Sequence, residues 1–362
     1  MTLSDIANSR LHSQQIAGTK LKTPKEVLAC MGAMQAQDYQ MAKWAIGVRL
    51  PGSTDKLIET AIDKGEIIRT HLLRPTWHLV SADDIYWMLE LTAPHIRSAM
   101  KAFAKDLGLT DKVVLRCLKI IEKALSDGKH LTREELMGML NKAKISTESF
   151  RSTHIMFHAE INGIVCNGAR NGKNNTYALL AERAPKKKTF AREEALAMLA
   201  QRYFSSHGPA TISDFRWWSG LPANDARAAL EMVKSKFISE KIGEEIYWFS
   251  DSFPISKNDK SSVYLLPAFD EFLISYKDRS ASFPHGNHKM AFTSNGIFRP
   301  VIVIDGHVTG IWKRTIKNEK VSIETELFRK HSKVEITAIN KSAAGFATFL
   351  NKKAEMTKTS IS

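Results

Sequence analysis

The sequence is poor in residues that define several common protein classes. It holds only three cysteines, Cys30, Cys117 and Cys166, which are widely spaced and set among apolar neighbours. Such cysteines are typical of buried free thiols in a reducing compartment, not of a disulfide framework. No cysteine and histidine spacing suits zinc, and no glycine-rich phosphate loop occurs. We therefore expect neither a metal nor a nucleotide cofactor.

Long apolar runs are missing as well. No stretch of about 18 or more apolar residues occurs, so the sequence predicts no transmembrane helix. The first residues show no basic segment followed by an apolar one, so no signal peptide is expected. The predicted location is the cytoplasm, in association with the nucleoid, and no membrane partner is expected.

Negative charge is in short supply. Lysine and arginine number 52 against 38 aspartate and glutamate residues, a net charge of +14, and the pI is near 9.5. This excess indicates a polyanionic partner, with a basic protein that lacks one as the alternative. The basic residues are dispersed along the chain, which does not favour a membrane surface.

Residues 31–49 combine glutamines, an aspartate, aromatic residues and basic residues. Gln35 and Gln37, two positions apart, would face opposite directions on a helix but share a face in an extended segment. The pair can act together only if the preceding helix ends near Met34 and the chain then extends through Gln37. The alternative is a continuing helix with two solvated glutamines.

A unit of helices followed by two short strands recurs three times. In the first copy we expect helices near residues 4–16 and 24–34 and strands at residues 67–72 and 76–80. In the second copy, two Asn-Gly steps join the strands, which is a strong hairpin signal. This is the winged-helix pattern, in which one helix enters a DNA groove and the hairpin contacts the backbone. Three such units favour DNA over RNA as the partner.

From residue 263 the pattern changes to short β-strands. A final helix near residues 341–352 precedes a polar tail. The candidate strands are residues 263–267, 272–276, 299–305 and 308–312. The expected domains are residues 1–105, 106–185, 186–255 and 256–362.

Five motifs resemble those of the bacterial DNA glycosylases of the AlkZ and YcaQ type, and they follow one another along the chain in the same order. The resemblance covers about residues 5 to 315 and implies an α+β fold, with three tandem winged-helix units forming a concave platform plus a small β-barrel-like C-terminal module. The motifs are residues 34–39 with 44–49 (MQAQDY, WAIGVR), 69–80 (RTHLLRPTWHLV), 207–221 (HGPATISDFRWWSGL), 265–279 (LLPAFDEFLISYKDR) and 298–300 (FRP).

The resemblance also implies a catalytic motif. The AlkZ-like branch has glutamine, an apolar residue and glutamine, which Gln35-Ala36-Gln37 matches; the YcaQ-like branch ends in aspartate. An amide is too weak a base to deprotonate water, so two glutamines make sense only where the leaving group is already activated. The expected activity is that of a monofunctional DNA glycosylase acting on cationic purines alkylated at N7 or N3, interstrand crosslinks included. The alternative to the two glutamines is Asp38, whose carboxylate could act as the general base.

Five further residues are candidate DNA-phosphate contacts: Arg69, His71 and Arg74 on the first hairpin, and Arg170 and Lys173 at the tip of the second. The alternatives are surface charge for Arg74, a hydrogen-bonded structural histidine for His71, and a solvated turn for the second tip.

Four charged residues near residue 270 are expected to form an ion-pair corner of the β module, with no catalytic role. They are Asp270, Glu271, Asp278 and Arg279.

The expected partner is double-stranded DNA carrying alkylated purines, bound by a monomer. The alternative is a non-enzymatic winged-helix DNA-binding protein such as a transcription regulator, which reads sequence and usually binds as a dimer. Three units in one chain and the lack of an evident dimerisation coiled coil favour the glycosylase. A family member that recognises lesions without catalysis is a third possibility.

Overall fold

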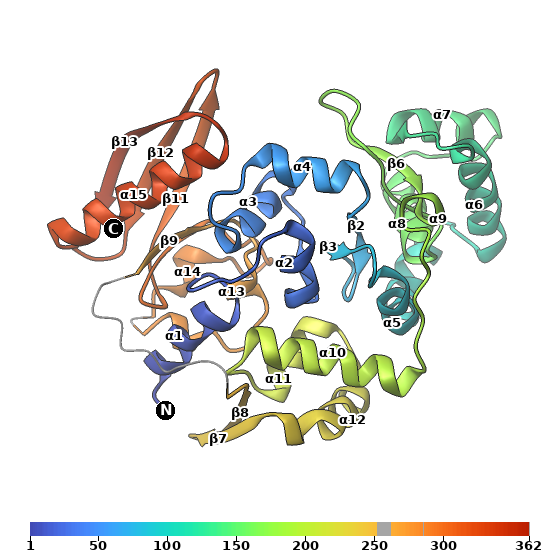
Figure 1. Ribbon diagram of the computed structural model, residues 1–362. Helices are drawn as coiled ribbons and strands as arrows, with labels where there is room; N and C mark the ends of the chain where they lie inside the picture. The colour runs from blue at the N-terminus through green and yellow to red at the C-terminus, as the bar shows by residue number, and fades with distance from the viewer. Residues whose placement is uncertain (252–261, 285, 362) are drawn as a thin grey trace.

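The computed structural model describes residues 1–251, 262–284 and 286–361. Three helical repeats are followed by a C-terminal sheet module, so the architecture is mixed α+β (Figure 1). The expected boundary between residues 255 and 256 lies outside the described residues. Within the described ranges, no helix has the length and apolar character needed to cross a membrane.

Each repeat follows the same chain path of helix, short strand, two helices and hairpin. In repeat 1 the short strand pairs with the second hairpin strand, in the order β1-β3-β2, and repeat 2 has the matching order β4-β6-β5. In repeat 3 a single bridge from Ala210 to Trp248 takes the place of the short strand. The threefold recurrence that the sequence predicted is therefore present.

The bounds of these elements are as follows. Repeat 1 consists of α2 (Pro24–Met31), β1 (Ala33–Gln35), α3 (Tyr39–Arg49), α4 (Asp55–Asp63), β2 (Ile67–Leu72) and β3 (Thr76–Ser81). Helix α5 (Ile85–Asp106) leads to repeat 2, with α6 (Asp111–Leu125), β4 (Leu131–Thr132), α7 (Arg133–Lys142), α8 (Arg151–Ile161), β5 (Val165–Asn167) and β6 (Thr176–Leu179). After α9 (Leu180–Arg183), repeat 3 consists of α10 (Arg192–His207), α11 (Ile212–Ser219), α12 (Ala223–Val233), the 3-10 turn η1 (Lys234–Lys236), β7 (Ile238–Ile242) and β8 (Glu245–Phe249).

Helix α1 (Leu3–Ser13) does not belong to repeat 1, where the sequence had placed it. Its Ile6 packs with Tyr247 of repeat 3 and with Ala281, and its Leu11 packs in the core of the C-terminal module with Phe272. The first helix of repeat 1 is therefore α2.

The C-terminal module is a five-stranded sheet in the order β13-β12-β11-β10-β9. Among the described residues β13 and β9 are its two edges, so the sheet is open and the expected barrel-like closure is not found. The polar tail forms β13, parallel to β12, and the expected strand at residues 272–276 overlaps a helix, α13. The strands are β9 (Val263–Leu266), β10 (Val301–Ile304), β11 (His307–Lys317), β12 (Lys320–Leu327) and β13 (Lys353–Ile361), and the helices are α13 (Glu271–Ile274), η2 (Ser280–Ser282), α14 (His288–Ala291) and α15 (Lys333–Phe349).

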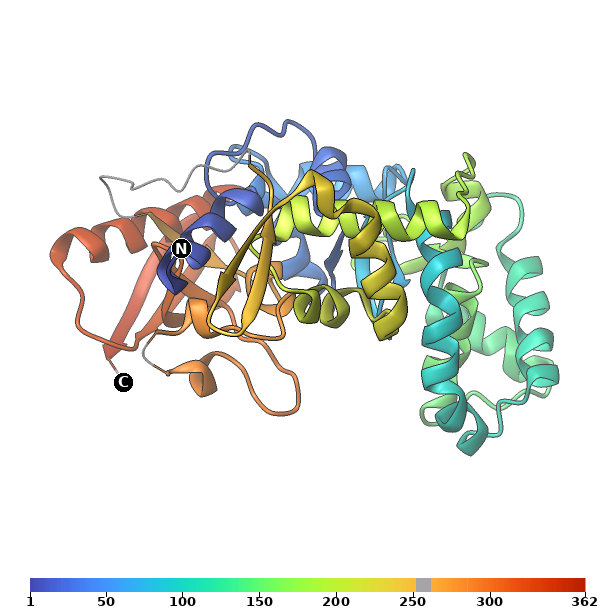
Figure 2. The ribbon, with the colours of Figure 1, turned by 90° about the horizontal axis from the view of Figure 1, so that it is seen from below.

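The β1-β3-β2 sheet lies between the two largest cores. Met34 and Leu79 face a core shared with the C-terminal module, whereas Ala33 and Val80 face a core shared with repeat 3. Repeat 2 lies at one end of the molecule and the C-terminal sheet at the other (Figures 1 and 2). The segment with the two glutamines is therefore central, with packing on both faces.

Candidate active site

Helix α2 ends before the two glutamines. Its last residue is Met31, and Gly32 follows with a φ of 79° and a ψ of −68°, a non-helical conformation with positive φ that glycine adopts without strain. Strand β1 then extends the chain to Gln35. Of the two alternatives that the sequence left open, the continuing helix is wrong, and the chain is extended only as far as Gln35, since Ala36 and Gln37 lie beyond the strand and the chain bends at Gln37.

The backbone after β1 is held from several directions. The Gln35 N–H donates to Oε1 of Glu271 at 2.6 Å, and the Ala36 N–H donates to the carbonyl of Trp77 at 2.7 Å. The Arg69 guanidinium donates two hydrogen bonds to the Ala36 carbonyl, at 2.9 and 3.1 Å. The segment that carries the glutamines is thus fixed through its peptide groups, which leaves both amide side chains available for other contacts.

The two amides have different surroundings. Gln35 is only 6% exposed, and its Oε1 accepts a hydrogen bond from Arg74 at 3.0 Å. Gln37 is exposed and borders a cavity of about 370 Å³ together with Arg69 and Trp77. Both residues are described, and no hydrogen bond joins their side chains. Because Gln37 follows the last paired residue of β1, strand alternation does not determine its direction.

The cavity beside Gln37 lies where repeats 1 and 2 meet, and it is rich in guanidinium groups. Arg69 stacks over Trp77 with 4.5 Å to the ring centroid, and burial lowers its pKa. Arg133 donates to the hydroxyl of Thr153 at 2.7 Å. Within the described ranges neither guanidinium forms an ion pair. Two half-buried cations without a carboxylate partner favour an anionic ligand.

Comparisons with known proteins identify the family. A sequence model of the family described as DNA glycosylase AlkZ-like matches residues 28–349. The chain belongs to this family. It is 23% identical over 360 residues to the "Interstrand DNA cross-link repair glycosylase" of Streptomyces sahachiroi, covering 93% of this chain and 94% of that protein. The solved structure of the Streptomyces sahachiroi DNA glycosylase AlkZ matches with a TM-score of 0.81 at 18% identity, over 100% of both chains. Membership of the AlkZ-like family favours the glycosylase over the transcription regulator.

In this AlkZ-like protein His71 is a buried residue. It is 7% exposed and its ring lies between Trp77 and Phe157, with centroid distances of 4.7 and 4.9 Å. Its Nδ1 and backbone N–H both contact the carboxylate of Glu160, which is 2% exposed. These contacts favour the structural alternative over a phosphate contact.

The two candidates on the second hairpin differ from each other. The Arg170 N–H donates to Asp63 of α4 at 3.0 Å, and its guanidinium lies 3.7 Å from Glu59. The hairpin connection is thus docked on repeat 1 at this residue. Lys173 is exposed. Of the two, Lys173 is the more accessible to DNA.

Asp38 has a defined structural role. Its side chain accepts the Met41 N–H at 3.1 Å as the N-cap of α3, and it lies 3.6 Å from Arg314 of β11. Capping is a common function of aspartate at this position of a helix. The rival base is therefore engaged with α3 and β11.

Two buried carboxylates support the site: Glu160, which the sequence did not suggest, and Glu271, for which the sequence predicted a different role. The expected ion-pair corner is wrong, because Asp270 pairs with Arg49 of α3 and Glu271 binds the Gln35 backbone. A signal was available only for Glu160, which lies between Ala159 and Ile161, since a charge among apolar residues is buried only with partners.

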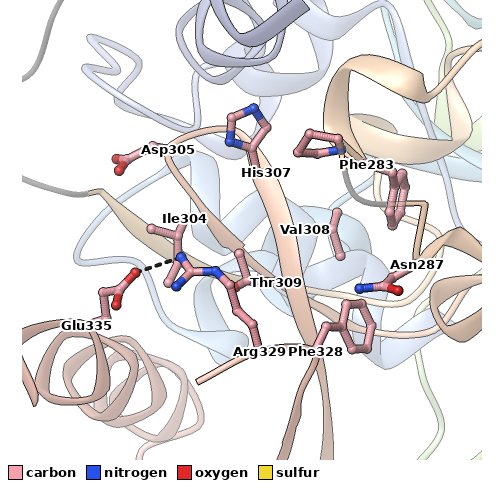
Figure 3. Close-up of a pocket in the computed structure, with 11 residues that line it drawn as sticks. Phe283, Asn287, Ile304, Asp305, His307, Val308, Thr309, Phe328, Arg329 and Glu335 are labelled. Carbon is pink, nitrogen blue, oxygen red and sulfur yellow. Dashed lines mark hydrogen bonds and ion pairs between the residues drawn. The ribbon is translucent and has the colours of Figure 1, made fainter. Parts of the chain in front are cut away.

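A separate cavity of about 210 Å³ lies in the C-terminal module (Figure 3). Its polar groups include Asp305, His307 and the ion pair of Arg329 with Glu335, at 2.8 Å. None of the predicted site residues lines this cavity, so we assign it no part in the reaction.

Proposed function

We propose that this protein is a monofunctional DNA glycosylase that hydrolyses the N-glycosidic bond of cationic alkylated purines and leaves an abasic site. The observation that carries the proposal is the placement of two neutral amides beside guanidinium groups: Gln35, at the end of β1, accepts a hydrogen bond from Arg74, and Gln37 borders the cavity that Arg69 also lines. The family match supports the type of reaction. The name of the Streptomyces relative supports interstrand crosslinks as part of the substrate range.

Two amides suffice when the leaving group is already activated. A purine alkylated at N7 or N3 carries a positive charge, so its glycosidic bond breaks readily toward an oxocarbenium-like state. The enzyme then has to orient a water and stabilise charge on the sugar, which is positioning and electrostatics. Normal, neutral bases resist this chemistry, so the reaction itself selects damaged DNA.

Gln35 and Gln37 together position the attacking water in this scheme. An amide oxygen has two lone pairs, and Arg74 occupies one of those on Gln35. The other accepts one hydrogen of the water, and the exposed amide of Gln37 accepts the second. Arg74 also keeps the oxygen of Gln35, rather than its NH2 group, at a defined place.

DNA binding uses the three repeats, which we propose are winged-helix units forming a concave platform for a duplex. Arg69, Arg170 and Lys173 contact phosphates, and Arg133, which forms no ion pair with the described residues, adds a contact that the sequence did not suggest. Arg74 can contact a phosphate only after its hydrogen bond to Gln35 is broken. Such contacts position the duplex without reading its sequence.

The test is base release by the double variant Gln35→Ala and Gln37→Ala. In single-turnover assays on a duplex containing N7-methylguanine, we expect the rate above spontaneous depurination to fall by about a hundredfold or more. Gln40→Ala, an exposed glutamine on α3, is the matched control and should retain the wild-type rate. Wild-type release from N7- and N3-alkylated and crosslinked duplexes, compared with undamaged DNA, defines the substrate range. A double variant as active as the wild type would contradict the proposal.

A further inference from the structure

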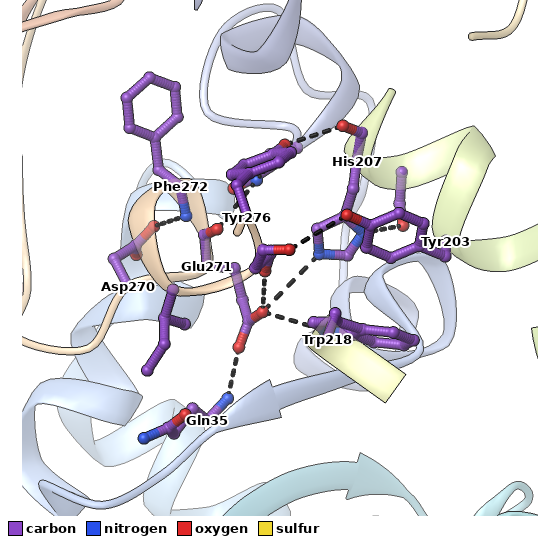
Figure 4. A network of polar contacts seen from close by, with 12 residues as sticks. Gln35, Tyr203, His207, Trp218, Asp270, Glu271, Phe272 and Tyr276 are labelled. Carbon is purple, nitrogen blue, oxygen red and sulfur yellow. Dashed lines mark hydrogen bonds and ion pairs between the residues drawn. The ribbon is translucent and has the colours of Figure 1, made fainter. Parts of the chain in front are cut away.

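The buried carboxylate of Glu271 is bonded directly to the strand that carries Gln35. Glu271 is 1% exposed and is 236 positions from Gln35 in the chain. Its Oε1 accepts the Gln35 N–H at 2.6 Å, and its Oε2 accepts Nε1–H of Trp218 at 3.1 Å and the hydroxyl of Ser275 (Figure 4). Three donors, from β1, α11 and the residue that follows α13, therefore converge on the two oxygens.

The neighbouring residue holds the other end of the same segment. Asp270 accepts two hydrogen bonds of 2.9 Å from the guanidinium of Arg49, the last residue of α3. Because β1 ends at Gln35 and α3 ends at Arg49, the start of α13 fixes residues 35–49 at both ends. This arrangement is independent of the contacts that Arg69 and Trp77 make with Ala36.

The contacts of the Glu271 carboxylate favour its ionised form. Burial by itself raises the pKa of Glu271, but the nearby His207, the Ser275 hydroxyl and the Gln35 N–H stabilise the charged form and lower the pKa overall. A hydrogen bond from a peptide N–H to a charged carboxylate is stronger than one to a neutral acceptor. The position of Gln35 is therefore restrained by one strong contact from a distant part of the chain.

We propose that Glu271 is a positioning residue that holds the backbone of Gln35 so that its amide oxygen meets the attacking water. The inference rests on the proposed function, because it assumes that Gln35 acts in catalysis. Glu271 does not touch the substrate; it acts through the Gln35 peptide group. Reactions of this kind are sensitive to displacements of about 1 Å, which lower rates by about a hundredfold.

Glu271→Gln tests the proposal with little change of shape. The amide has one oxygen where the carboxylate has two, so its NH2 group faces either the Gln35 N–H or the Trp218 and Ser275 donors. We expect the single-turnover excision rate to fall by about tenfold to a hundredfold, with the Kd for undamaged duplex unchanged. Ser275→Ala is the matched control, because it removes a donor to Oε2 and leaves the bond to Gln35 in place. The excision rate of Ser275→Ala should remain within about threefold of wild type, although its loss of thermal stability should be similar to that of Glu271→Gln.

A double-mutant cycle and hydrogen exchange separate positioning from general destabilisation. In a Gln35→Ala background, Glu271→Gln should lower the excision rate no further, and the amide of Gln35 should exchange faster in Glu271→Gln than in Ser275→Ala. Fully multiplicative rate losses, or equal exchange in the two variants, would overturn the inference while the glycosylase proposal stands. If the wild type releases no base, the proposed function fails and the exchange comparison alone decides the role of Glu271. Glu271→Asp, which keeps the charge but shortens the side chain, replaces Glu271→Gln should that variant not fold.

Discussion

Neutral side chains at the proposed catalytic positions have a direct kinetic consequence. Neither Gln35 nor Gln37 titrates, and the nearby guanidinium groups of Arg69 and Arg74 stay charged through the physiological range. Excision should therefore depend little on pH. A carboxylate base such as Asp38 would instead lose activity on acidification.

We expect the excision rate of Asp38→Asn to stay within about threefold of wild type between about pH 5 and pH 8. Asparagine caps a helix about as well as aspartate does, so α3 should persist. Loss of a true general base lowers rates by about a hundredfold to ten-thousandfold. Single-turnover rates of wild type and variant across this pH range are the measurement, and a loss of that size would make Asp38 the base.

His78, opposite Gln35 in the sheet, makes folding sensitive to acid. Its Nδ1 lies 3.0 Å from the Thr76 carbonyl, and burial, with a contribution from Arg74, lowers its pKa from 6.5 to about 3. The unfolded chain takes up this proton below about pH 6.5 while the folded protein does not. As the pH is lowered from about 6.5 to about 3, the free energy of unfolding should therefore decrease. This group contributes at most about 1.4 kcal/mol per pH unit.

Urea unfolding of His78→Asn at about pH 6.5 and pH 4.5 tests this contribution. The variant should lose less stability between the two pH values than the wild type, whatever its stability at neutral pH. The exposed His288→Asn is the control and should keep the wild-type dependence. Equal slopes for His78→Asn and wild type would show that another group is responsible.

Among the secondary-structure elements, α8 of repeat 2 and the β2–β3 hairpin of repeat 1 are joined by one buried carboxylate. Glu160 accepts hydrogen bonds from the backbone N–H and ring of His71 and from Nε1–H of Trp77, at 3.1 Å for the last. The same hairpin carries Arg69 and Arg74. Contacts at the repeat interface therefore help to place the cations beside the two glutamines.

Glu160→Ala should lower the free energy of unfolding by about 2–4 kcal/mol, because it leaves the donors of His71 and Trp77 buried without an acceptor. Chemical denaturation is the measurement. The exposed Glu148→Ala, just before α8, should change stability by about 0.5 kcal/mol or less. Similar small effects in both variants would show that the repeats are held together by other contacts.

For the protein as a whole, the net charge of +14 and the three repeats predict strong, sequence-independent affinity for DNA. Each phosphate neutralised by a lysine or arginine releases counterions, so the binding constant should fall steeply with salt. This property belongs to the complete surface and not to any one contact.

Lys173→Ala should reduce the slope of log K against log salt by about one unit for an undamaged duplex. Fluorescence anisotropy titrations at several salt concentrations measure the slope. Lys112→Ala, an exposed lysine on α6, should leave it unchanged. Identical slopes for the two variants would place the second hairpin outside the DNA interface.

Local sequence signals predicted much of this structure. Capping boxes at Thr23 and Thr132 open α2 and α7, and the Asp-Gly step at residues 305 and 306 forms a tight turn between two strands, with φ angles of 48° and 81°. The motif at residues 35–37 pointed to the AlkZ-like family that the comparisons show. These signals depend on interactions within a few residues, so they can be read without knowing the rest of the fold.

Other features depend on contacts between distant residues, which local patterns do not encode. Residues 272–276 have the composition of a strand, yet Asp270 caps a short helix there while binding Arg49 across the chain. The polar tail becomes β13 only because β12 offers an edge with which it can pair. The partner of the Gln35 backbone, Glu271, was not foreseeable for the same reason: packing of repeats 1 and 3 against the C-terminal module decides which buried groups meet. The residues needed for the proposed chemistry were visible in the chain, but their mutual placement was a property of the tertiary fold.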